Sequence, residues 1–178
     1  MRRSALLLAS MALGTLLVSG VAWAANEIFC YGGECRGTPQ SDRIHGSSER
    51  DVIYAFNGTD YTWARGGRDE VYGFDGYDYV TGGTGIDKVS GGNGRDHLLD
   101  GPLEEYSRDT VNGGNGSDYS ETQNLPAYAD IVNCGEGDDT ARVDGEDIVN
   151  DDCESVQVVD ENGGVGGRLP SSATKTAK

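Results

Sequence analysis

Aspartate recurs at every ninth residue through the centre of the chain. Residues 37–99 divide without a gap into seven nonapeptides, and the sixth position of each one is Asp. These residues are Asp42, Asp51, Asp60, Asp69, Asp78, Asp87 and Asp96. A fixed short period is typical of a solenoid, in which each repeat adds one unit to a stack. The period therefore predicts a repeat architecture.

Two further positions of the repeat are nearly as regular. Position eight is Ile, Val or Leu in six of the seven repeats, and position four is Gly from the third repeat onward. We expect the position-eight side chains to point inward and stack in a thin aliphatic core. Glycine permits positive φ and close backbone approach, so that loop carbonyls can converge on one point. The position-eight residues are Ile44, Ile53, Thr62, Val71, Val80, Val89 and Leu98, and the glycines are Gly58, Gly67, Gly76, Gly85 and Gly94.

The same phase continues after residue 99 through two longer units. A 13-residue segment, 100–112, precedes a regular repeat at 113–121 (GGNGSDYSE), and a second longer unit spans 122–133. Insertions in solenoids map to loops on one face, so we expect these additions to bulge from one edge of the stack. The aspartates that keep the phase are Asp109, Asp118, Asp130, Asp139 and Asp147.

Composition adds a constraint on what can stabilise such a stack. The chain has 28 glycines and a formal net charge of −16. That much like charge opposes compaction unless counter-ions neutralise it. Nucleic-acid binding is excluded as a function class, because phosphate contacts require a basic face. By composition alone the chain would resemble a disordered protein, and only its regularity argues for a fold.

The repeat resembles the GGxGxDxUx calcium-binding repeat of the RTX, or haemolysin-type, family. The resemblance extends from residue 37 to about residue 158, and residues 82–99 contain two faithful copies. It implies an all-β fold, a parallel β-roll (right-handed β-solenoid), with six residues of each repeat in a turn and three in a short strand. It also implies Ca²⁺ between successive coils. Aspartate carboxylates and backbone carbonyls supply the six to eight oxygen ligands that this hard cation takes.

The resemblance implies metal ligands on two edges, because two repeats make one coil. One edge would have Asp42, Asp60, Asp78, Asp96, Asp118 and Asp139, and the other Asp51, Asp69, Asp87, Asp109, Asp130 and Asp147. The loop glycines that match best are Gly82, Gly83, Gly85, Gly91, Gly92, Gly94, Gly113, Gly114 and Gly116. The first two repeats depart from the pattern, with Gln40 and Glu49 at position four. Stacked carboxylates repel one another until cations separate them, so several Ca²⁺ ions are expected to drive folding.

A plainer interpretation is that Asp and Gly are simply favoured turn residues. A calcium-free solenoid, however, would not need Asp at every sixth position and would avoid the charge. We therefore interpret the repeats as calcium sites of a protein with a structural, extracellular role.

The amino-terminal residues predict export. Arg2 and Arg3 precede an apolar stretch, and Ala22-Trp23-Ala24 matches a signal-peptidase site, so we expect cleavage near Ala24 and secretion. A membrane anchor is the alternative, but the stretch is shorter than the roughly 20 residues a span requires. No membrane span is expected after signal removal.

Four cysteines fit an oxidising compartment and allow three disulfide connectivities. Their positions favour Cys30–Cys35 near one end and Cys134–Cys153 near the other, the second pair lying about one coil apart. Zinc is the competing interpretation, but the sequence lacks a C-x-x-C motif or paired histidines. The expected organisation is a signal peptide at 1–24, a disulfide-bonded cap at 25–36, the β-roll at 37–158 and a flexible tail at 159–178.

Aromatic residues at outward strand positions suggest a second function. Tyr61 and Trp63 would lie near Tyr79 on one face, and Tyr54 over Tyr72 on the other. Such a face would suit a polysaccharide or a surface protein, making the chain a calcium-gated binding module. The alternative is that aromatics favour strands and pair across them for stability.

The sequence does not favour an enzyme. It contains neither a G-x-S-x-G nor an H-E-x-x-H motif. Its two histidines, His45 and His97, fall at outward strand positions. The glycine-rich loops repeat every nine residues before three-residue strands, which argues against nucleotide binding.

Overall fold

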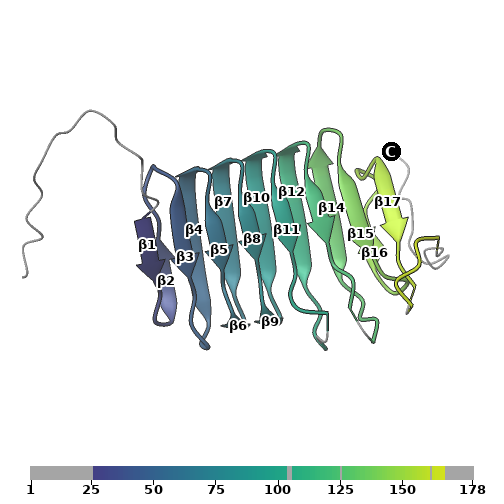
Figure 1. Ribbon diagram of the computed structural model, residues 1–178, viewed down its shortest axis with the longest axis horizontal. Helices are drawn as coiled ribbons and strands as arrows, with labels where there is room; N and C mark the ends of the chain where they lie inside the picture. Colours follow the sequence, from purple (N-terminus) through teal and green to yellow (C-terminus); the bar gives the residue numbers. More distant parts are fainter. Residues whose placement is uncertain (1–25, 104–105, 125, 161, 167–178) are drawn as a thin grey trace, which may run out of the picture.

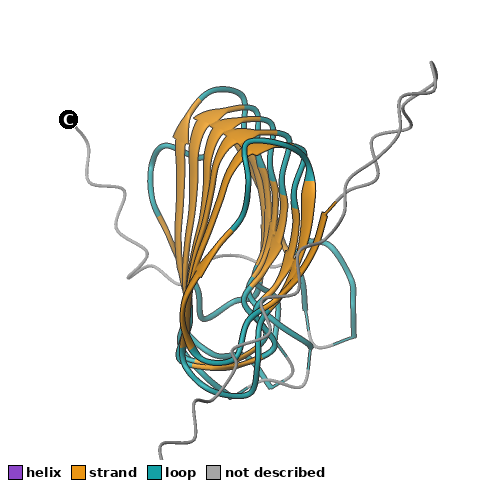
Figure 2. Ribbon diagram, turned by 90° about the vertical axis from the view of Figure 1, so that its left-hand side faces the viewer, coloured by secondary structure: helices purple, strands orange, loops and turns teal. Residues whose placement is uncertain are grey.

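The protein is a stack of parallel strands in two facing sheets (Figure 1). The computed structural model describes residues 26–103, 106–124, 126–160 and 162–166, so the expected signal peptide lies outside the described residues. In the view along the stack, the two sheets face each other and loops join them at two edges (Figure 2). Every pair of neighbouring strands is parallel. The predicted all-β parallel solenoid is confirmed.

The first sheet contains eight strands in the order of the chain. They are β1 (Asn26–Phe29), β3 (Asp42–His45), β5 (Tyr61–Trp63), β8 (Tyr79–Thr81), β11 (His97–Leu99), β13 (Tyr119–Glu121), β15 (Thr140–Val143) and β17 (Ser155–Val158). The second sheet contains β2 (Gly33–Arg36), β4 (Asp51–Gly58), β7 (Glu70–Gly76), β10 (Lys88–Gly94), β12 (Thr110–Gly116), β14 (Ile131–Glu136) and β16 (Ile148–Val149). Two short strands, β6 (Gly66–Gly67) and β9 (Thr84–Gly85), pair at the lower edge in Figure 1.

The aliphatic core is the column predicted from position eight. Ile44, Ile53, Val80 and Leu98 are fully buried, because alternate residues of each strand point between the two sheets. The core is divided into two clusters, one ending at Val111 and the other beginning at Val132. Ser120, which pairs with Leu98 and Ala141, occupies the core position between them. A small polar side chain there leaves the apolar contacts discontinuous.

The expected division into six turn residues and three strand residues holds only for the first sheet. Strands β4, β7, β10 and β12 have seven or eight residues and continue into the following turn. Positions two to four of these turns pair with the same positions of the next coil, as Gly92 does with Gly114. The backbone of the turns that follow these four strands therefore takes part in the hydrogen bonds of the second sheet.

The amino-terminal segment is a coil of its own and not only a loop before the first repeat. Strand β1 pairs with β3, and β2 pairs with β4, although neither carries the repeat motif. Cys30 and Cys35 form a disulfide across the turn between β1 and β2. The side-chain Nδ2 of Asn26 donates to Oδ1 of Asp42 at 2.9 Å, and the backbone N–H of Gly32 donates to Oδ1 of Asp51 at 3.0 Å. This coil supplies the donors that a preceding repeat would otherwise provide.

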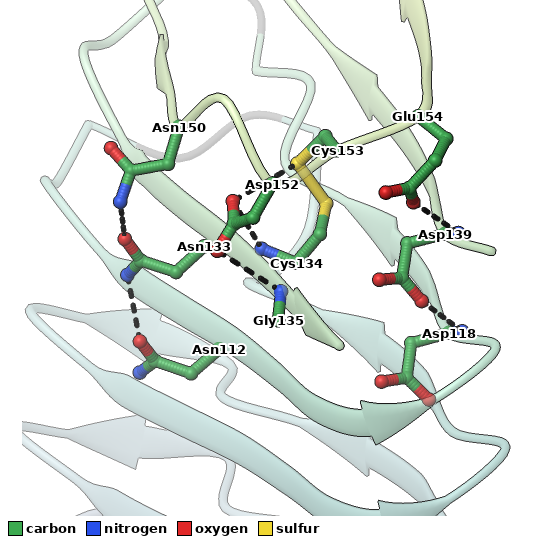
Figure 3. The surroundings of a disulfide bond; sticks show 10 residues. All are labelled: Asn112, Asp118, Asn133, Cys134, Gly135, Asp139, Asn150, Asp152, Cys153 and Glu154. Atoms are coloured by element: carbon green, nitrogen blue, oxygen red, sulfur yellow. Dashed lines mark hydrogen bonds between the residues drawn. A yellow bond between two sulfur atoms is a disulfide. The ribbon is translucent and has the colours of Figure 1, made fainter. Parts of the chain in front are cut away.

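The carboxyl-terminal coil is closed by side chains and a second disulfide, Cys134–Cys153 (Figure 3). The carboxylate of Asp152 accepts hydrogen bonds from the backbone N–H groups of Cys134 and Gly135, at 3.2 and 3.1 Å. Glu154 accepts the N–H of Asp139 at 2.8 Å. These bonds satisfy backbone donors at the open end of the stack, where unpaired strand edges invite association.

The ordered contacts run past residue 158, where we expected the tail to begin. Val159 is buried, and its N–H donates to the carbonyl of Val143 at 2.9 Å. Val165 forms an antiparallel bridge with Val159, and the N–H of Gly166 donates to the carbonyl of Val158 at 3.0 Å. These contacts hold Val165 and Gly166 against the end of β17.

Candidate calcium sites

The position-six aspartates form two hydrogen-bonded columns, one at each edge of the stack. In both columns the N–H of each aspartate before the last donates to Oδ1 of the aspartate one coil further on, with N–O distances of 2.6–2.9 Å. All twelve aspartates are at most 4% exposed. The lower column, named for the edge at which β6 and β9 lie in Figure 1, is Asp51, Asp69, Asp87, Asp109, Asp130 and Asp147. The upper column, at the opposite edge, is Asp42, Asp60, Asp78, Asp96, Asp118 and Asp139.

The second carboxylate oxygen of most of these aspartates is buried without a donor. Within the described residues, Oδ2 has no hydrogen-bond partner in Asp60, Asp69, Asp78, Asp96, Asp118, Asp130 and Asp139. A buried polar atom without a partner carries a desolvation cost of about 1–3 kcal/mol, and more when it is charged. A row of such oxygens fits a bound cation, which would replace the missing donors.

Backbone carbonyls approach the same oxygens. A Cβ built on Gly73 would lie 2.6 Å from Oδ2 of Asp78 and 2.6 Å from the carbonyl oxygen of Gly91, one coil further on. A Cβ on Gly94 would collide with the carbonyl oxygen of Gly76. A side chain at Gly73 would occupy the space between the carboxylate oxygen of Asp78 and the carbonyl oxygen of Gly91. The donor set is all oxygen, as Ca²⁺ prefers.

Burial makes these carboxylates difficult to ionise without a cation. Desolvation raises the pKa of Asp60, Asp78 and Asp96 to about 7, although the backbone hydrogen bond from the preceding aspartate of the column opposes the shift. The charge of a neighbouring aspartate in the column raises each of these pKa values further. In the lower column, burial raises the pKa of Asp69 to about 6, that of Asp147 to about 7 and that of Asp130 to about 9.

Three of the twelve aspartates have protein donors to Oδ2. The backbone N–H groups of Thr38 and Ser47 donate to Oδ2 of Asp42 and Asp51, at 2.6 and 2.7 Å. Oδ2 of Asp147 accepts from Thr122 Oγ1 at 2.8 Å and from the N–H of Asp144 at 2.9 Å. Protein donors take the place of a cation at these positions. Two of the three belong to the first two repeats, which depart from the glycine pattern.

Sequence reasoning missed several buried polar residues of the long loops. Asp100, Asn124 and Asp144 are each at most 4% exposed. An oxygen of Asp100 lies within 4.8 Å of oxygens of both Asp109 and Asp130. The only signal in the sequence is that Asp100 directly follows a regular repeat, where the motif would place Gly.

The aromatic residues stack along the outside of both sheets. The rings of Tyr61 and Tyr79 are 4.7 Å apart and inclined by 4°, and those of Tyr54 and Tyr72 are 5.4 Å apart. Trp63 stacks on His45 at 5.0 Å, and His45 stacks on Phe29 at 5.0 Å. The sequence did not lead us to place His45 and Phe29 in this column. Stacking follows from the parallel register, which puts the same repeat position at one place in every coil.

Parallel coils, glycine turns and columns of buried carboxylates define a class of protein, the calcium-binding β-roll. A model of the RTX calcium-binding nonapeptide repeat matches the chain in four copies, over residues 36–71, 72–99 and 106–120. These residues are RTX calcium-binding repeats, and the chain that contains them is a calcium-binding β-roll protein. The chain has no significant match among the curated proteins or the solved structures. Among the described residues there is no helix long and apolar enough to cross a membrane.

Proposed function

We propose that the protein is secreted and has a structural role outside the cell, with Ca²⁺ ions between successive coils holding it folded. The observation that carries this proposal is the row of buried Oδ2 atoms without donors, because the ion-free fold leaves them unsatisfied. The ligands we propose are the position-six aspartates and the loop carbonyls. The two disulfides fit an oxidising compartment. Repeats of this kind are generally non-catalytic, and we propose no enzymatic activity.

Calcium would act as a folding ligand. A cation that binds the native coil and not the unfolded chain stabilises the fold in proportion to the logarithm of its concentration. Each bound ion would also remove the repulsion between carboxylates of adjacent coils. Affinities in the range of other extracellular calcium modules, about 10⁻⁴–10⁻³ M, would keep the protein folded only after export.

A calcium titration of the metal-free protein without residues 1–24 tests this proposal. We expect a cooperative gain of β-sheet circular dichroism, with a parallel change in fluorescence of Trp63, the one tryptophan after residue 24. Mg²⁺ should not substitute, because it demands near-octahedral geometry and is reluctant to lose its waters. Asp78→Asn should weaken the response, whereas Asp75→Asn, an exposed position of the same loop, should not. Full β signal in excess chelator would contradict the proposal. Export would be tested separately, by finding Ala25 at the amino terminus of the secreted protein.

A second candidate function is a calcium-gated binding module. It is favoured by the aromatic face, defined as Tyr61, Trp63 and Tyr79, whose rings follow one another along the first sheet. Flat aromatic surfaces suit sugar rings or an extended partner. A panel of soluble polysaccharides should then change Trp63 fluorescence in calcium and not in chelator, with Tyr72→Ala on the opposite sheet as the control. No response to any polysaccharide would leave the structural role alone.

A further inference from the structure

The segments that join the two sheets at the lower edge of the stack become longer after the third regular turn. The turns at 64–69 and 82–87 have six residues, but the next two are the longer loops 100–109 and 122–130. Asp100 begins the first of these loops. Its N–H donates to the carbonyl of Glu121 at 3.3 Å, as that of Gly82 does to Leu99 one coil earlier, at 3.0 Å. Asp100 therefore occupies the first-glycine position of a repeat and places a carboxylate where Gly46 and Gly82 of earlier coils have no side chain.

Three carboxylates meet at this place. One oxygen each from Asp100, Asp109 and Asp130 lies within 4.8 Å of the other two. The three residues are at most 2% exposed. Three negative charges at this spacing, out of contact with water, are strongly unfavourable unless protons or a cation compensate them.

Asn124 provides an independent indication of a missing ligand. Its side chain is 1% exposed, and its Oδ1 has no hydrogen-bond partner among the described residues. Its Nδ2 donates to Oδ2 of Asp100 at 3.0 Å, which places the amide against one of the three carboxylates. The backbone N–H of Asn124 donates to the buried carboxylate of Asp144 at 3.2 Å and fixes the residue in this position. A buried amide oxygen without a donor is a suitable neutral ligand for a cation.

We propose that Asp100, Asp109, Asp130 and the amide oxygen of Asn124 form a separate cation site that joins the two long loops. Two oxygens on opposite sides of one Ca²⁺ are about 5 Å apart, since each bond is about 2.3–2.6 Å long, so the spacing suits this ion. Mg²⁺ is reluctant to lose its waters, which disfavours it at a buried site whose ligands all come from the protein. All ligands are oxygens, which argues against zinc with its preference for nitrogen and sulfur.

This site differs in charge from the sites of the regular repeats. It combines three carboxylates in one cluster, whereas a regular site between two coils would have two position-six aspartates and backbone carbonyls. Calcium affinity rises with the number of charged ligands and with the rigidity of the site. The loop site is therefore expected to fill first as calcium rises, before the regular turns. The inference rests on the proposed function for Asp109 and Asp130, which also belong to the lower column. Asp100 and Asn124 belong to the loop site alone.

The experiment is a competition titration of the full chain with Ca²⁺ against a chromophoric chelator. The wild type should show one site at least about tenfold tighter than the others. Asp100→Asn, which keeps the shape and removes one charge, should weaken that site about tenfold or more and leave the others unchanged. Asp78→Asn, the matched control in a regular turn, should lose a weak site and keep the tight one.

Several outcomes separate this inference from the proposed function. An Asp100→Asn titration identical to that of the wild type would overturn the loop site while leaving the repeat sites standing. A chain that binds no Ca²⁺ at all would overturn both. Circular dichroism in saturating calcium shows whether Asp100→Asn folds. If Asp100→Asn does not fold, the Asn124→Ala variant is measured instead, because this variant keeps all three charges. Unchanged tight binding by Asn124→Ala would overturn the loop site, and severalfold weaker binding would support it.

Discussion

At the scale of single residues, the fold depends on how the buried polar atoms of each coil are satisfied. Most position-six aspartates use Oδ1 for a backbone donor of the preceding coil and keep Oδ2 without one. A buried polar atom without a hydrogen-bond partner also occurs inside the core. Thr62 lies between Ile44 and Val80 in the first sheet, it is 1% exposed, and its Oγ1 has no partner among the described residues.

Replacing Thr62 by valine should therefore stabilise the protein. The substitution keeps the branched shape and removes a buried hydroxyl that gains no hydrogen bond, so we expect the free energy of unfolding in saturating calcium to rise by about 1 kcal/mol. Urea unfolding followed by circular dichroism measures the change. The control is Thr81→Val, a partly exposed position of the same sheet, which should change stability by less than about 0.5 kcal/mol. A loss of stability in Thr62→Val would show that the hydroxyl has a partner, such as a buried water.

At the scale of elements, each coil is held mainly by its two neighbours, so the end coils need additional constraints. Side chains that repeat in register add to the sheet pairing. The amide of Asn133 donates to Asn112, and that of Asn150 donates to Asn133 (Figure 3). A disulfide joins residues within each terminal region, and the two differ in the length of chain that they close.

The carboxyl-terminal disulfide should contribute more stability than the amino-terminal one. Cys134 and Cys153 are 19 residues apart, whereas Cys30 and Cys35 are 5 apart. The entropy removed from the unfolded chain grows with the logarithm of loop length, so replacing Cys134 and Cys153 by serine should cost about 1 kcal/mol more than replacing Cys30 and Cys35. Urea unfolding of the two double variants in saturating calcium provides the comparison. Equal losses, or a larger loss at Cys30–Cys35, would contradict this account.

At the scale of the whole molecule, the two columns of carboxylates make the fold responsive to calcium and to protons. The net charge of −16 is concentrated in part in these columns, where the residues are buried. The same groups must be ionised to bind a cation and neutral to be buried without one. The ion-bound and ion-free proteins therefore depend on pH in opposite directions.

In calcium-free buffer, acidification should promote the fold. Burial raises the pKa of Asp60, Asp78 and Asp96 from 3.8 to about 7, so the native coil binds protons more tightly than the unfolded chain. The resulting stability is fully present below about pH 4 and is lost as the pH rises through 7. We expect more β-sheet circular dichroism at pH 5 than at pH 8.

The calcium-loaded protein should behave in the opposite way. Because ligands must be deprotonated, the calcium midpoint should move to higher concentration as the pH falls from 7 to 6. Titrations monitored by Trp63 fluorescence at several pH values give this midpoint. A midpoint that does not change with pH, or a metal-free chain that is less ordered at pH 5 than at pH 8, would contradict the assignment of these aspartates.

The sequence by itself determined the repeating part of this protein. A nine-residue period, with Asp at position six and an aliphatic residue at position eight, predicted a solenoid with a core column, because in a solenoid every repeat meets the same neighbours. The resemblance to the RTX repeat implied the parallel coils and the two edges. The disulfide pairs also followed from position, since Cys134 and Cys153 are about one coil apart in the chain.

Only the tertiary structure decided what happens where the period fails. Residues 26–36 lack the motif, yet they form a coil because their backbone can pair with β3 and β4. Asp100 and Asn124 lie in different loops, 24 residues apart, and their hydrogen bond follows from the stacking of coils and from no local pattern. Repeat positions are equivalent by symmetry and can be read from the chain. The conformation of an insertion depends on contacts between loops, and the folded coils alone bring those loops together.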